Sequence, residues 1–330
     1  MKDAPLLKVQ DVSKHFKIKS SFVDKYLFKK QNTVKAVSNI SLDIRAGETL
    51  GLIGESGCGK STLGRVILRL HEPTRGKVFF GSKEITALKE KELKKIKRKM
   101  QIIFQDPYAS LNPRMSVEDI ISLPLKVHES LSRKETGQRV ADITERVGLK
   151  PQHLRRYPHQ FSGGQRQRIG IARALILRPE FVVCDEPVSA LDVSIQAQII
   201  QLMGKLKDEL SLTMLFISHD ISVVAYLSDR IAVMYLGELV EIAGVIQLLK
   251  NPLHPYTRVL LDAIPQVEHI GLHKRVILKG DIPSPLSPPC GCKFHTRCPE
   301  AIGRCAIDVP VARENSPSHW VSCHLFENDQ

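Results

Sequence analysis

Short apolar runs recur along the chain, and polar or glycine-rich stretches separate them. Four of these runs lack strict alternation, and they cover Thr49–Gly54, Met100–Phe104, Phe181–Glu186 and Thr213–Asp220. Continuous apolar runs of this length are typical of strands that are buried on both faces of a parallel sheet. A fifth run, Arg230–Gly244, predicts a closing hairpin. Because polar residues end or follow these runs, we expect an α/β fold whose ligand-binding groups lie at the carboxyl edge of the sheet.

The middle of the chain has a different pattern. Val117–Pro158 is polar and helical in character and includes the segment SRKETGQRVADITERVGL, so it predicts an inserted helical subdomain at about residues 107–165. Near the C-terminus, Pro-rich stretches such as DIPSPLSPP lead into a cysteine-rich tail. We therefore expect one large domain over residues 1–264 and a small Pro- and Cys-rich extension over 265–330, with a boundary near Ile264–Gln266.

The composition is that of an ordinary globular protein, with 42% hydrophobic and 25% charged residues among 330. No apolar run approaches the ~18 residues that cross a bilayer. The N-terminal segment MKDAPLLKVQ lacks the apolar core of a secretory signal, so we expect a soluble, cytosolic chain. The net charge of +13 fits either contact with polyanions or a cationic surface. The densest basic run, Lys89–Lys99, favours a solvated helix face.

The candidate chemistry begins with the loop GESGCGKS, which lies between a predicted strand and a predicted helix. In this G-x-x-x-x-G-K-S pattern, glycines let backbone N–H groups turn inward around phosphate oxygens. The helix that begins near Lys60 directs its N-terminal dipole at the anion. We expect Lys60 to reach the β- and γ-phosphates of ATP and Ser61 to ligate Mg²⁺. The residues expected to bind ATP here are Gly54, Glu55, Ser56, Gly57, Cys58, Gly59, Lys60, Ser61 and Thr62.

Cys58 lies inside this loop at the start of the helix. The pKa of a thiol tends to fall at such a position. Two interpretations follow: Cys58 is a reactive thiol whose alkylation blocks ATP binding, or it is a small residue that fills space.

Two further polar elements have a defined chemistry. Asp185 ends the apolar run FVVC and is placed to hold Mg²⁺, and Glu186 can act as the general base for an attacking water. Ser162 and Gln165 have the spacing of a capping box. That spacing predicts either a well-capped helix alone or a second anion site made of exposed N–H groups and the serine hydroxyl.

The order of these motifs resembles that of an ATP-binding-cassette (ABC) subunit over residues of about 5 to 250. Besides the P-loop, the matching segments are SGGQ at 162–165, the DE pair at 185–186, SALD at 189–192 and SHD at 218–220. Gln105 follows MQIIF and looks like the glutamine of the family's Q-loop. SGGQ belongs to the family's signature motif, and the only departure from that motif is Phe161, which stands where leucine is usual.

The resemblance implies a P-loop cassette with a RecA-like core, an antiparallel β subdomain and a helical subdomain. It also implies three contacts with ATP or its reaction: Phe16 stacks on adenine, Gln105 contacts Mg²⁺ and the attacking water, and His219 contacts the γ-phosphate. Asp192 would lie at the interface with a second subunit. The residues that would contact ATP on the P-loop of that subunit are Ser162, Gly163, Gly164 and Gln165.

Other segments narrow the resemblance to one group of ABC proteins. NPLHPYT at 251–257, PSPL at 283–286 and PYASLNP at 107–113 look like segments of dipeptide and oligopeptide importers, and GESGCGKSTLGR resembles their F-type ATPase subunit. This implies a peripheral protein on the cytoplasmic face of the inner membrane. Its expected partners are a second ABC ATPase in a heterodimer, two permease subunits and, indirectly, an extracytoplasmic peptide-binding protein; no nucleic acid is expected. The alternatives are another cargo (nickel, an opine, glutathione or an antimicrobial peptide) and a non-transport ABC ATPase that acts on nucleic acid or ribosomes.

Seven cysteines, an odd number in a chain without a signal, argue against a disulfide framework. Four near the C-terminus, Cys292, Cys298, Cys305 and Cys323, contain no C-x-x-C pair, which disfavours a zinc ribbon. Four thiolates suit either Zn²⁺ or an iron–sulfur cluster, and unligated thiols are a third possibility. His295, His319 or His324 could complete a zinc site, and Cys290 is a spare. Some relatives of the resembling family carry a 4Fe–4S cluster at this spacing, so we favour the cluster over zinc.

Overall fold

The computed structural model describes residues 4–17, 33–262 and 281–327. The chain divides into two units. The first contains residues 1–7, 44–49 and 80–218, and the second contains residues 8–43, 50–79 and 219–330. The expected boundary near Ile264–Gln266 lies outside the described residues.

Three neighbouring parallel strands form the sheet of the first unit. They are β6 (Met100–Ile103), β7 (Phe181–Asp185) and β8 (Thr213–Ile217). Met100 lies opposite Phe181, and Phe181 lies opposite Thr213, so the strands run in register. Every residue of β7 and β8 is buried, as the continuous apolar runs predicted.

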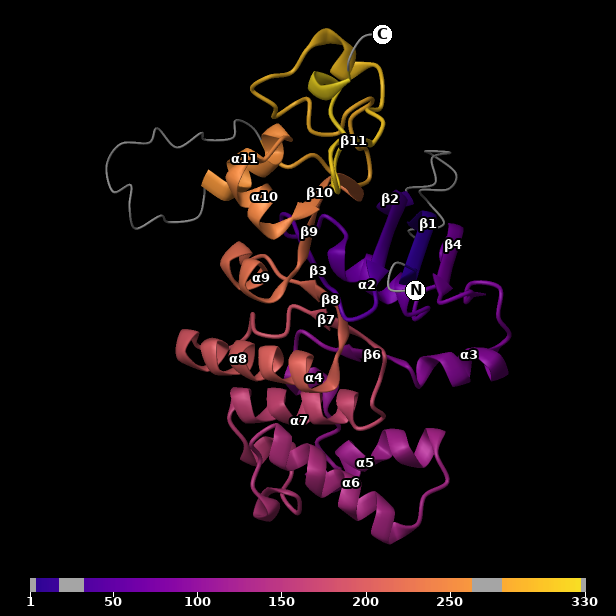
Figure 1. Cartoon of the computed structure of the whole chain (residues 1–330), viewed down its shortest axis with the longest axis vertical. Helices are drawn as coiled ribbons and strands as arrows, with labels where there is room; N and C mark the ends of the chain where they lie inside the picture. The colour runs from indigo at the N-terminus through magenta and orange to yellow at the C-terminus, as the bar shows by residue number, and fades with distance from the viewer. Residues whose placement is uncertain (1–3, 18–32, 263–280, 328–330) are drawn as a thin grey trace, which may run out of the picture. The chain divides into compact units, whose positions relative to one another are not determined.

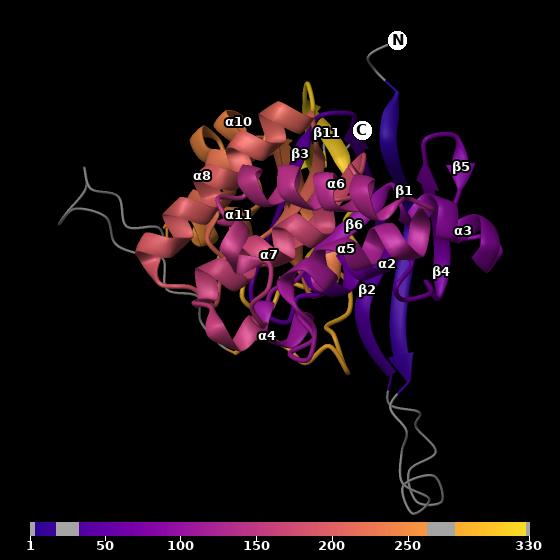
Figure 2. The same cartoon turned by 90° about the horizontal axis from the view of Figure 1, so that it is seen from below.

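Helices make up most of the rest of the first unit. Serine residues cap two of them: the Ser116 hydroxyl accepts the Asp119 N–H at 3.2 Å, and Ser132 forms a reciprocal capping box with Glu135. Helices α4, α5 and α6 pack against α7 (Figures 1 and 2). The elements of this unit besides β6–β8 are β5 (Lys83–Glu84), α3 (Glu90–Lys97), α4 (Pro107–Ser110), α5 (Val117–His128), α6 (Arg133–Arg146), η1 (Pro151–His153), η2 (Pro158–Gln160), α7 (Gly163–Leu175) and α8 (Val193–Leu210).

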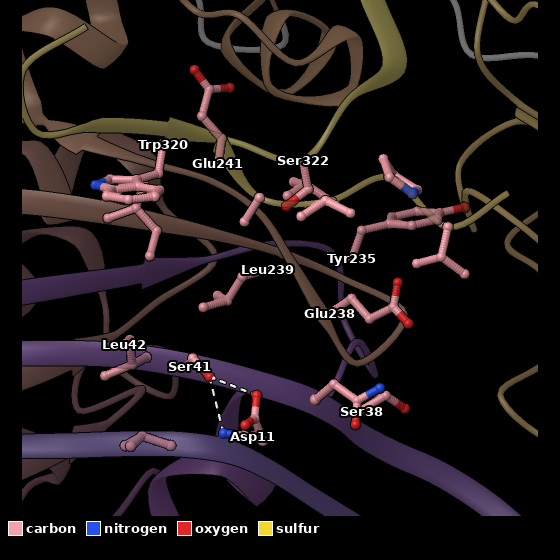
Figure 3. A pocket seen from close by; sticks show the side chains of 18 of the residues that line it. Asp11, Ser38, Ser41, Leu42, Tyr235, Glu238, Leu239, Glu241, Trp320 and Ser322 are labelled. Carbon is pink, nitrogen blue, oxygen red and sulfur yellow. Dashed lines mark hydrogen bonds between the residues drawn. The ribbon is translucent and has the colours of Figure 1, made fainter. Parts of the chain in front are cut away.

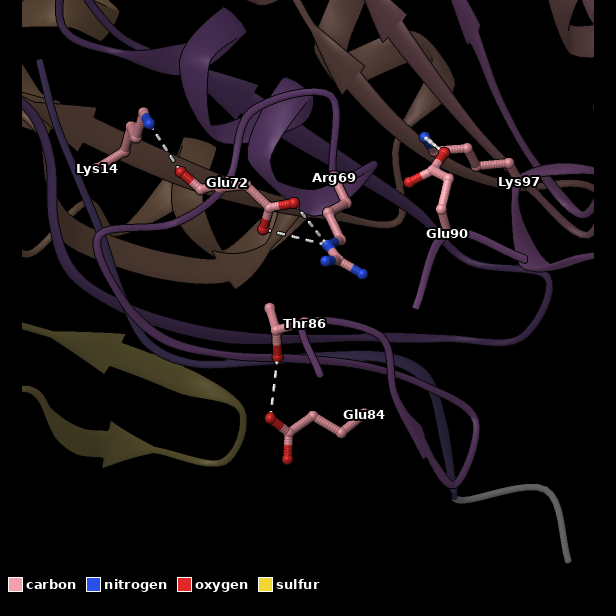
Figure 4. Close-up of polar contacts among 7 residues, drawn as sticks. All are labelled: Lys14, Arg69, Glu72, Glu84, Thr86, Glu90 and Lys97. Carbon is pink, nitrogen blue, oxygen red and sulfur yellow. Dashed lines mark hydrogen bonds and ion pairs between the residues drawn. The ribbon is translucent and has the colours of Figure 1, made fainter. Parts of the chain in front are cut away.

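The basic run Lys89–Lys99 forms α3. Only Leu93 and Ile96 of this helix are buried, so the lysines lie on its solvated side. Lys97 pairs with Glu90 at 3.4 Å between Nζ and Oε1 (Figure 4). The interpretation of this run as a solvated helix face is therefore confirmed.

The second unit contains two groups of strands. In one, β1 (Pro5–Lys17) lies between β2 (Thr33–Arg45) and β4 (Arg75–Phe80), and nearly all their residues belong to this unit. The other group joins β3 (Thr49–Ile53) in parallel to β9 (Arg230–Tyr235). β9 then forms the predicted hairpin with β10 (Glu238–Gly244), whose turn residues Leu236 and Gly237 have φ values of 41° and 84°. Two positive φ angles are typical of a tight hairpin turn.

The C-terminal segment extends this second group. β10 pairs with β12 (His319–Val321), and β12 pairs with β11 (Arg313–Ser316). The buried carboxylate of Glu241 on β10 accepts the backbone N–H groups of Leu253 and His254 at 2.8 and 2.9 Å, and His319 Nε2 lies 2.7 Å away. The helices of this unit are α2 (Lys60–Ile67), α9 (Ile221–Leu227), α10 (Val245–Lys250), α11 (Pro255–Asp262), η4 (Gly303–Ala306) and η5 (His324–Phe326).

Hydrogen bonds tie the end of α2 to β1 in the second unit (Figure 4). Arg69 Nε pairs with Glu72 Oε1 at 2.9 Å, and Lys14 Nζ donates to the Glu72 carbonyl oxygen at 2.7 Å. These contacts fix the segment that follows the P-loop helix. Among the described helices of both units, none is both long enough and apolar enough to cross a bilayer.

Candidate active site

The P-loop follows the fully buried strand β3 in the second unit. Gly54, Gly57 and Gly59 have φ values of 151°, 79° and 107°. A Cβ atom at Gly54 would collide with the carbonyl oxygen of Met234, and one at Gly59 would collide with that of Ala36. The loop therefore needs glycine at both positions, for its backbone angle and for the close approach of a neighbouring strand.

Lys60 is the first residue of α2 and is 4% exposed. Its Nζ donates to the carbonyl oxygens of Gly54 at 2.7 Å and Glu55 at 3.0 Å, so the ammonium group lies on the inner side of the loop. Ser61 and Thr62 follow in the first helical turn and are half-buried. This donor set, with a cation, hydroxyl groups and a helix N-terminus, suits a phosphate chain.

Cys58 does not have the expected low pKa. Its side chain is buried, and burial raises its pKa more than the neighbouring Lys60 lowers it. Lys60 Nζ lies 3.8 Å from Sγ. The expectation of a lowered pKa is therefore wrong, because desolvation of the thiolate outweighs the nearby positive charge. The structure favours the interpretation of Cys58 as a residue that fills space.

Asp185, Glu186 and Gln105 meet in the first unit. Asp185 is the buried last residue of β7, and Gln105 follows the neighbouring strand β6. Gln105 Nε2 donates to Glu186 Oε2 at 3.0 Å. Because β6 and β7 are parallel, their carboxyl ends bring these side chains to the same edge of the sheet. Glu186 has a φ of 45°, a backbone conformation that is uncommon outside glycine, and its N–H donates to the Ile217 carbonyl at 3.0 Å.

The signature segment begins α7 in the same unit. Ser162 forms the predicted capping box: its hydroxyl accepts the Gln165 N–H at 3.4 Å, and the Gln165 side chain accepts the Ser162 N–H at 3.1 Å. Ser162 is exposed, Gly163 is half-buried and Gly164 is buried. Asp192 is the exposed N-cap of α8, and its side chain makes no capping hydrogen bond.

The remaining two site candidates belong to the second unit. His219 is exposed shortly before α9, and Asp220 caps that helix by accepting the Ser222 N–H at 2.9 Å. Phe16 is half-buried near the end of β1. Its ring meets His71 edge to face at a centroid distance of 5.6 Å, and Lys14 Nζ lies 4.9 Å from its centroid.

Two residues near the P-loop were missed by the sequence patterns. Arg297 forms a bidentate ion pair with Glu55, and Tyr256 Oη accepts the Glu55 N–H at 2.9 Å. More than 200 positions separate these partners in the sequence. The segment NPLHPYT contains Tyr256, but it indicated only a family resemblance, and no local pattern could connect it to the loop.

The four C-terminal cysteines lie within electrostatic reach of one another. Burial, and to a smaller extent the thiols of Cys292, Cys298 and Cys305, raise the pKa of Cys323 to about 12. The Cys292 N–H donates to the Cys305 carbonyl at 2.8 Å, and Cys290 is exposed.

The arrangement does not support the zinc alternative. Over the described ranges, no group of three or more His, Cys, Asp or Glu side chains could hold a metal ion. The three histidines also have other partners: His295 Nδ1 lies 2.8 Å from the Cys292 carbonyl, His319 bonds to Glu241, and His324 bonds to Glu327. The described residues therefore give no support to zinc or to the favoured iron–sulfur cluster at these cysteines.

The second unit contains a separate cavity of about 800 Å³. Side chains from β1, β2, β10 and the C-terminal segment line it, among them Asp11, Ser41, Leu239 and Trp320 (Figure 3). Ser41 Oγ donates to Asp11 Oδ1 at 3.1 Å and accepts the Asp11 N–H at 2.9 Å. No residue expected to bind ATP belongs to this lining.

Comparison with known proteins agrees with the motif order. Residues 37–189 match the family model of the ABC transporter, and residues 240–305 match that of the oligopeptide/dipeptide transporter C-terminal region. The chain is 51% identical over 324 residues to the oligopeptide transport ATP-binding protein AppF of Bacillus subtilis, covering 97% of both chains. It is 48% identical to the oligopeptide transport ATP-binding protein OppF of Salmonella typhimurium, covering 96% of this chain and 95% of that one.

A solved structure shows the same fold. It is the dimeric structure of a post-hydrolysis state of the ATP-binding cassette MJ0796 bound to ADP and Pi, which is 31% identical with a TM-score of 0.64. The match covers 72% of this chain and 98% of that chain. Because about half of its residues are identical to those of AppF and OppF over nearly the full length, the chain belongs to the ABC transporter family of ATP-binding proteins. Within this family it belongs to the group of the oligopeptide transport ATP-binding proteins.

Proposed function

We propose that this chain is the ATP-hydrolysing subunit that powers the import of di- or oligopeptides. The observation that carries the proposal is the nearly full-length similarity to oligopeptide transport ATP-binding proteins, which includes the C-terminal region. The ATP-binding loop and the Gln105–Glu186 pair supply the chemistry of the motor.

In the proposed reaction, water attacks the γ-phosphorus and ATP becomes ADP and phosphate. The P-loop amides and Lys60 hold the phosphates, and Glu186 accepts a proton from the attacking water. Gln105 orients the Glu186 carboxylate through their hydrogen bond. Oxygen donors on Ser61 and Asp185 suit Mg²⁺, which when bound neutralises charge on the phosphates. Phe16 would stack on adenine, and His219 would contact the γ-phosphate.

The signature of one subunit would complete the site of the other. In this scheme Ser162, Gly163, Gly164 and Gln165 contact ATP on a second ABC ATPase, and Asp192 lies at the interface. The proposed partners are that ATPase, as a heterodimer, and two permease subunits on the cytoplasmic face of the inner membrane. A peptide-binding protein outside the membrane would supply the cargo.

Uptake of labelled peptides tests this function. We expect a strain that carries Glu186→Gln to lose uptake of labelled di- or oligopeptides, while Glu180→Gln, on a surface carboxylate 2.6 Å from Lys99, retains it. Normal peptide uptake by the Glu186→Gln strain, with loss of nickel, opine or glutathione uptake instead, would overturn the peptide assignment.

We further propose a 4Fe–4S cluster on Cys292, Cys298, Cys305 and Cys323. Support comes from their four-cysteine composition, which suits such clusters. When bound, a cluster of this kind supplies structural cross-links or electron transfer. Anaerobically purified protein should contain iron and sulfide and absorb near ~400 nm. Cys298→Ser should lower the iron content and Cys290→Ser should not; equal iron in both variants would contradict the proposal.

A further inference from the structure

The C-terminal segment touches the P-loop at Glu55. Arg297 Nη1 lies 2.8 Å from Glu55 Oε2, and Arg297 Nη2 lies 3.0 Å from Oε1. The Arg297 side chain is 7% exposed and that of Glu55 is 21% exposed. A bidentate guanidinium–carboxylate pair with so little exposure to water is a strong and directional contact.

Two other contacts hold the same residue. The Glu55 N–H donates to Tyr256 Oη at 2.9 Å, and the Glu55 carbonyl oxygen accepts Lys60 Nζ at 3.0 Å. Glu55 is therefore fixed at its amide, its carbonyl and its carboxylate. Since Lys60 is the phosphate-binding cation of the loop, the position of Glu55 is linked directly to the position of that cation.

Aromatic packing supports the Arg297 and Tyr256 side chains. The rings of Tyr235 and Tyr256 lie 4.7 Å apart between centroids, and Phe294 lies 5.2 Å from Tyr235 and 5.3 Å from Tyr256. Lys293 Nζ also donates to the Leu236 carbonyl at 2.8 Å, which anchors the segment to the β9–β10 turn. These contacts therefore hold the segment that carries Arg297 beside the loop.

The negative charge of Glu55 explains why the ion pair with Arg297 is needed. A carboxylate in the P-loop, five positions before Lys60, opposes the binding of a polyphosphate by repulsion. The guanidinium neutralises this carboxylate and holds it in the ion pair. Without Arg297, the Glu55 carboxylate would be free to move and would compete with the phosphates for Lys60.

We propose that Arg297 is a positioning residue for ATP binding, which holds Glu55 and through it the phosphate-binding face of the P-loop. The C-terminal segment is then part of the nucleotide site. This role rests on the proposed ATPase function of the chain and adds a residue to it from outside the cassette motifs.

ATP affinity of the full chain tests the proposal. We expect Arg297→Gln to weaken ATP binding on the order of tenfold, the scale of one charge-assisted hydrogen-bonded pair. In the assembled transporter, KM for ATP should rise while kcat at saturating ATP changes less than about twofold, because Glu186 and Gln105 are untouched. Arg304→Gln is the matched control: in the same segment it breaks the pairs with Asp308 and Glu327, both at 3.1 Å and both away from the P-loop, and it should leave ATP affinity unchanged.

A second variant separates positioning from folding. Glu55→Gln removes the repulsive charge, so adding it to Arg297→Gln should restore most of the ATP affinity that Arg297→Gln loses. If Arg297→Gln does not fold, Arg297→Lys, which keeps the charge and loses the fork, should weaken ATP binding by about threefold. Unchanged affinity in Arg297→Gln or Arg297→Lys, or no recovery in the double variant, would overturn the proposal. Absence of ATP binding by the unchanged chain would instead overturn the proposed function.

Discussion

At the scale of single residues, Glu186 combines an uncommon backbone angle with a hydrogen bond from Gln105. Glu186→Gln preserves the size of the side chain and an oxygen that accepts this bond, but removes the group that takes a proton. We expect ATP binding to persist and hydrolysis in the assembled transporter to fall on the order of 10²–10⁴-fold, the scale of general-base loss. Phosphate release and nucleotide affinity measure the two effects, with Glu180→Gln as control. Near-normal turnover would remove Glu186 from this role.

Lys60 should affect the binding of ATP itself. Lys60→Ala removes a buried ammonium that lies on the inner side of the P-loop. We expect ATP affinity to fall at least about tenfold, since hydrogen bonds to charged groups contribute roughly 1.5–3 kcal/mol. Titration with a fluorescent ATP analogue measures it, and unchanged affinity would contradict the phosphate-binding role.

Cys58 allows a pH-dependent test. Thiol reagents react with the thiolate, and burial raises the pKa of Cys58 above its ordinary value. The thiolate is therefore scarce at neutral pH and becomes more abundant only as the pH rises above ~8.5, the pKa of a free cysteine. We expect iodoacetamide to label Cys58 more slowly than the exposed Cys290 at pH ~7, as mass spectrometry of the peptides would show. Equal rates at that pH would contradict the raised pKa.

At the scale of elements, α7 has a cap that also belongs to the signature. Ser162→Ala removes the capping hydroxyl and should lower the free energy of unfolding by about 0.5–2 kcal/mol. Ser132→Ala removes the equivalent capping box of α6 and should lower it by a similar amount. Only Ser162→Ala should also lower ATP turnover of the assembled transporter. Denaturant titration measures stability, and phosphate release measures turnover. An equal loss of turnover in both variants would show that Ser162 acts only as a helix cap.

The sequence patterns predicted the buried strands well and the long-range contacts poorly. β6, β7 and β8 begin at the predicted residues, because a run of apolar side chains records burial on both faces of a sheet. The Gln105–Glu186 contact also follows from strand order. The pairing of β12 with β10 and the contact of Arg297 with Glu55 have no local signal, because both depend on how distant segments pack. The pKa of Cys58 was missed for the same reason, since burial depends on tertiary structure.

At the scale of the whole molecule, the proposed dimer has two ATP sites, and this chain would contribute residues to both and complete neither. In this proposal, each site combines the P-loop of one subunit with the signature of the other. We therefore expect the isolated chain to hydrolyse ATP slowly and the second ATPase subunit to raise the turnover per P-loop at least about tenfold, within the range that a single catalytic group contributes. Phosphate release at increasing ratios of the two subunits measures this effect. A full rate from the isolated chain at low concentration would contradict the shared site.

The position of Arg297 also affects how this protein can be shortened or lengthened. A chain trimmed after residue 250, where the motifs of the ABC subunit end, would keep every nucleotide motif and would still lack the guanidinium and the phenol that hold Glu55. Its weak affinity for ATP would then reflect the trimming and could be mistaken for a property of the natural motor. For the same reason, an insertion beside Tyr256 or Phe294 should weaken ATP binding, because these rings belong to the aromatic cluster that supports Arg297.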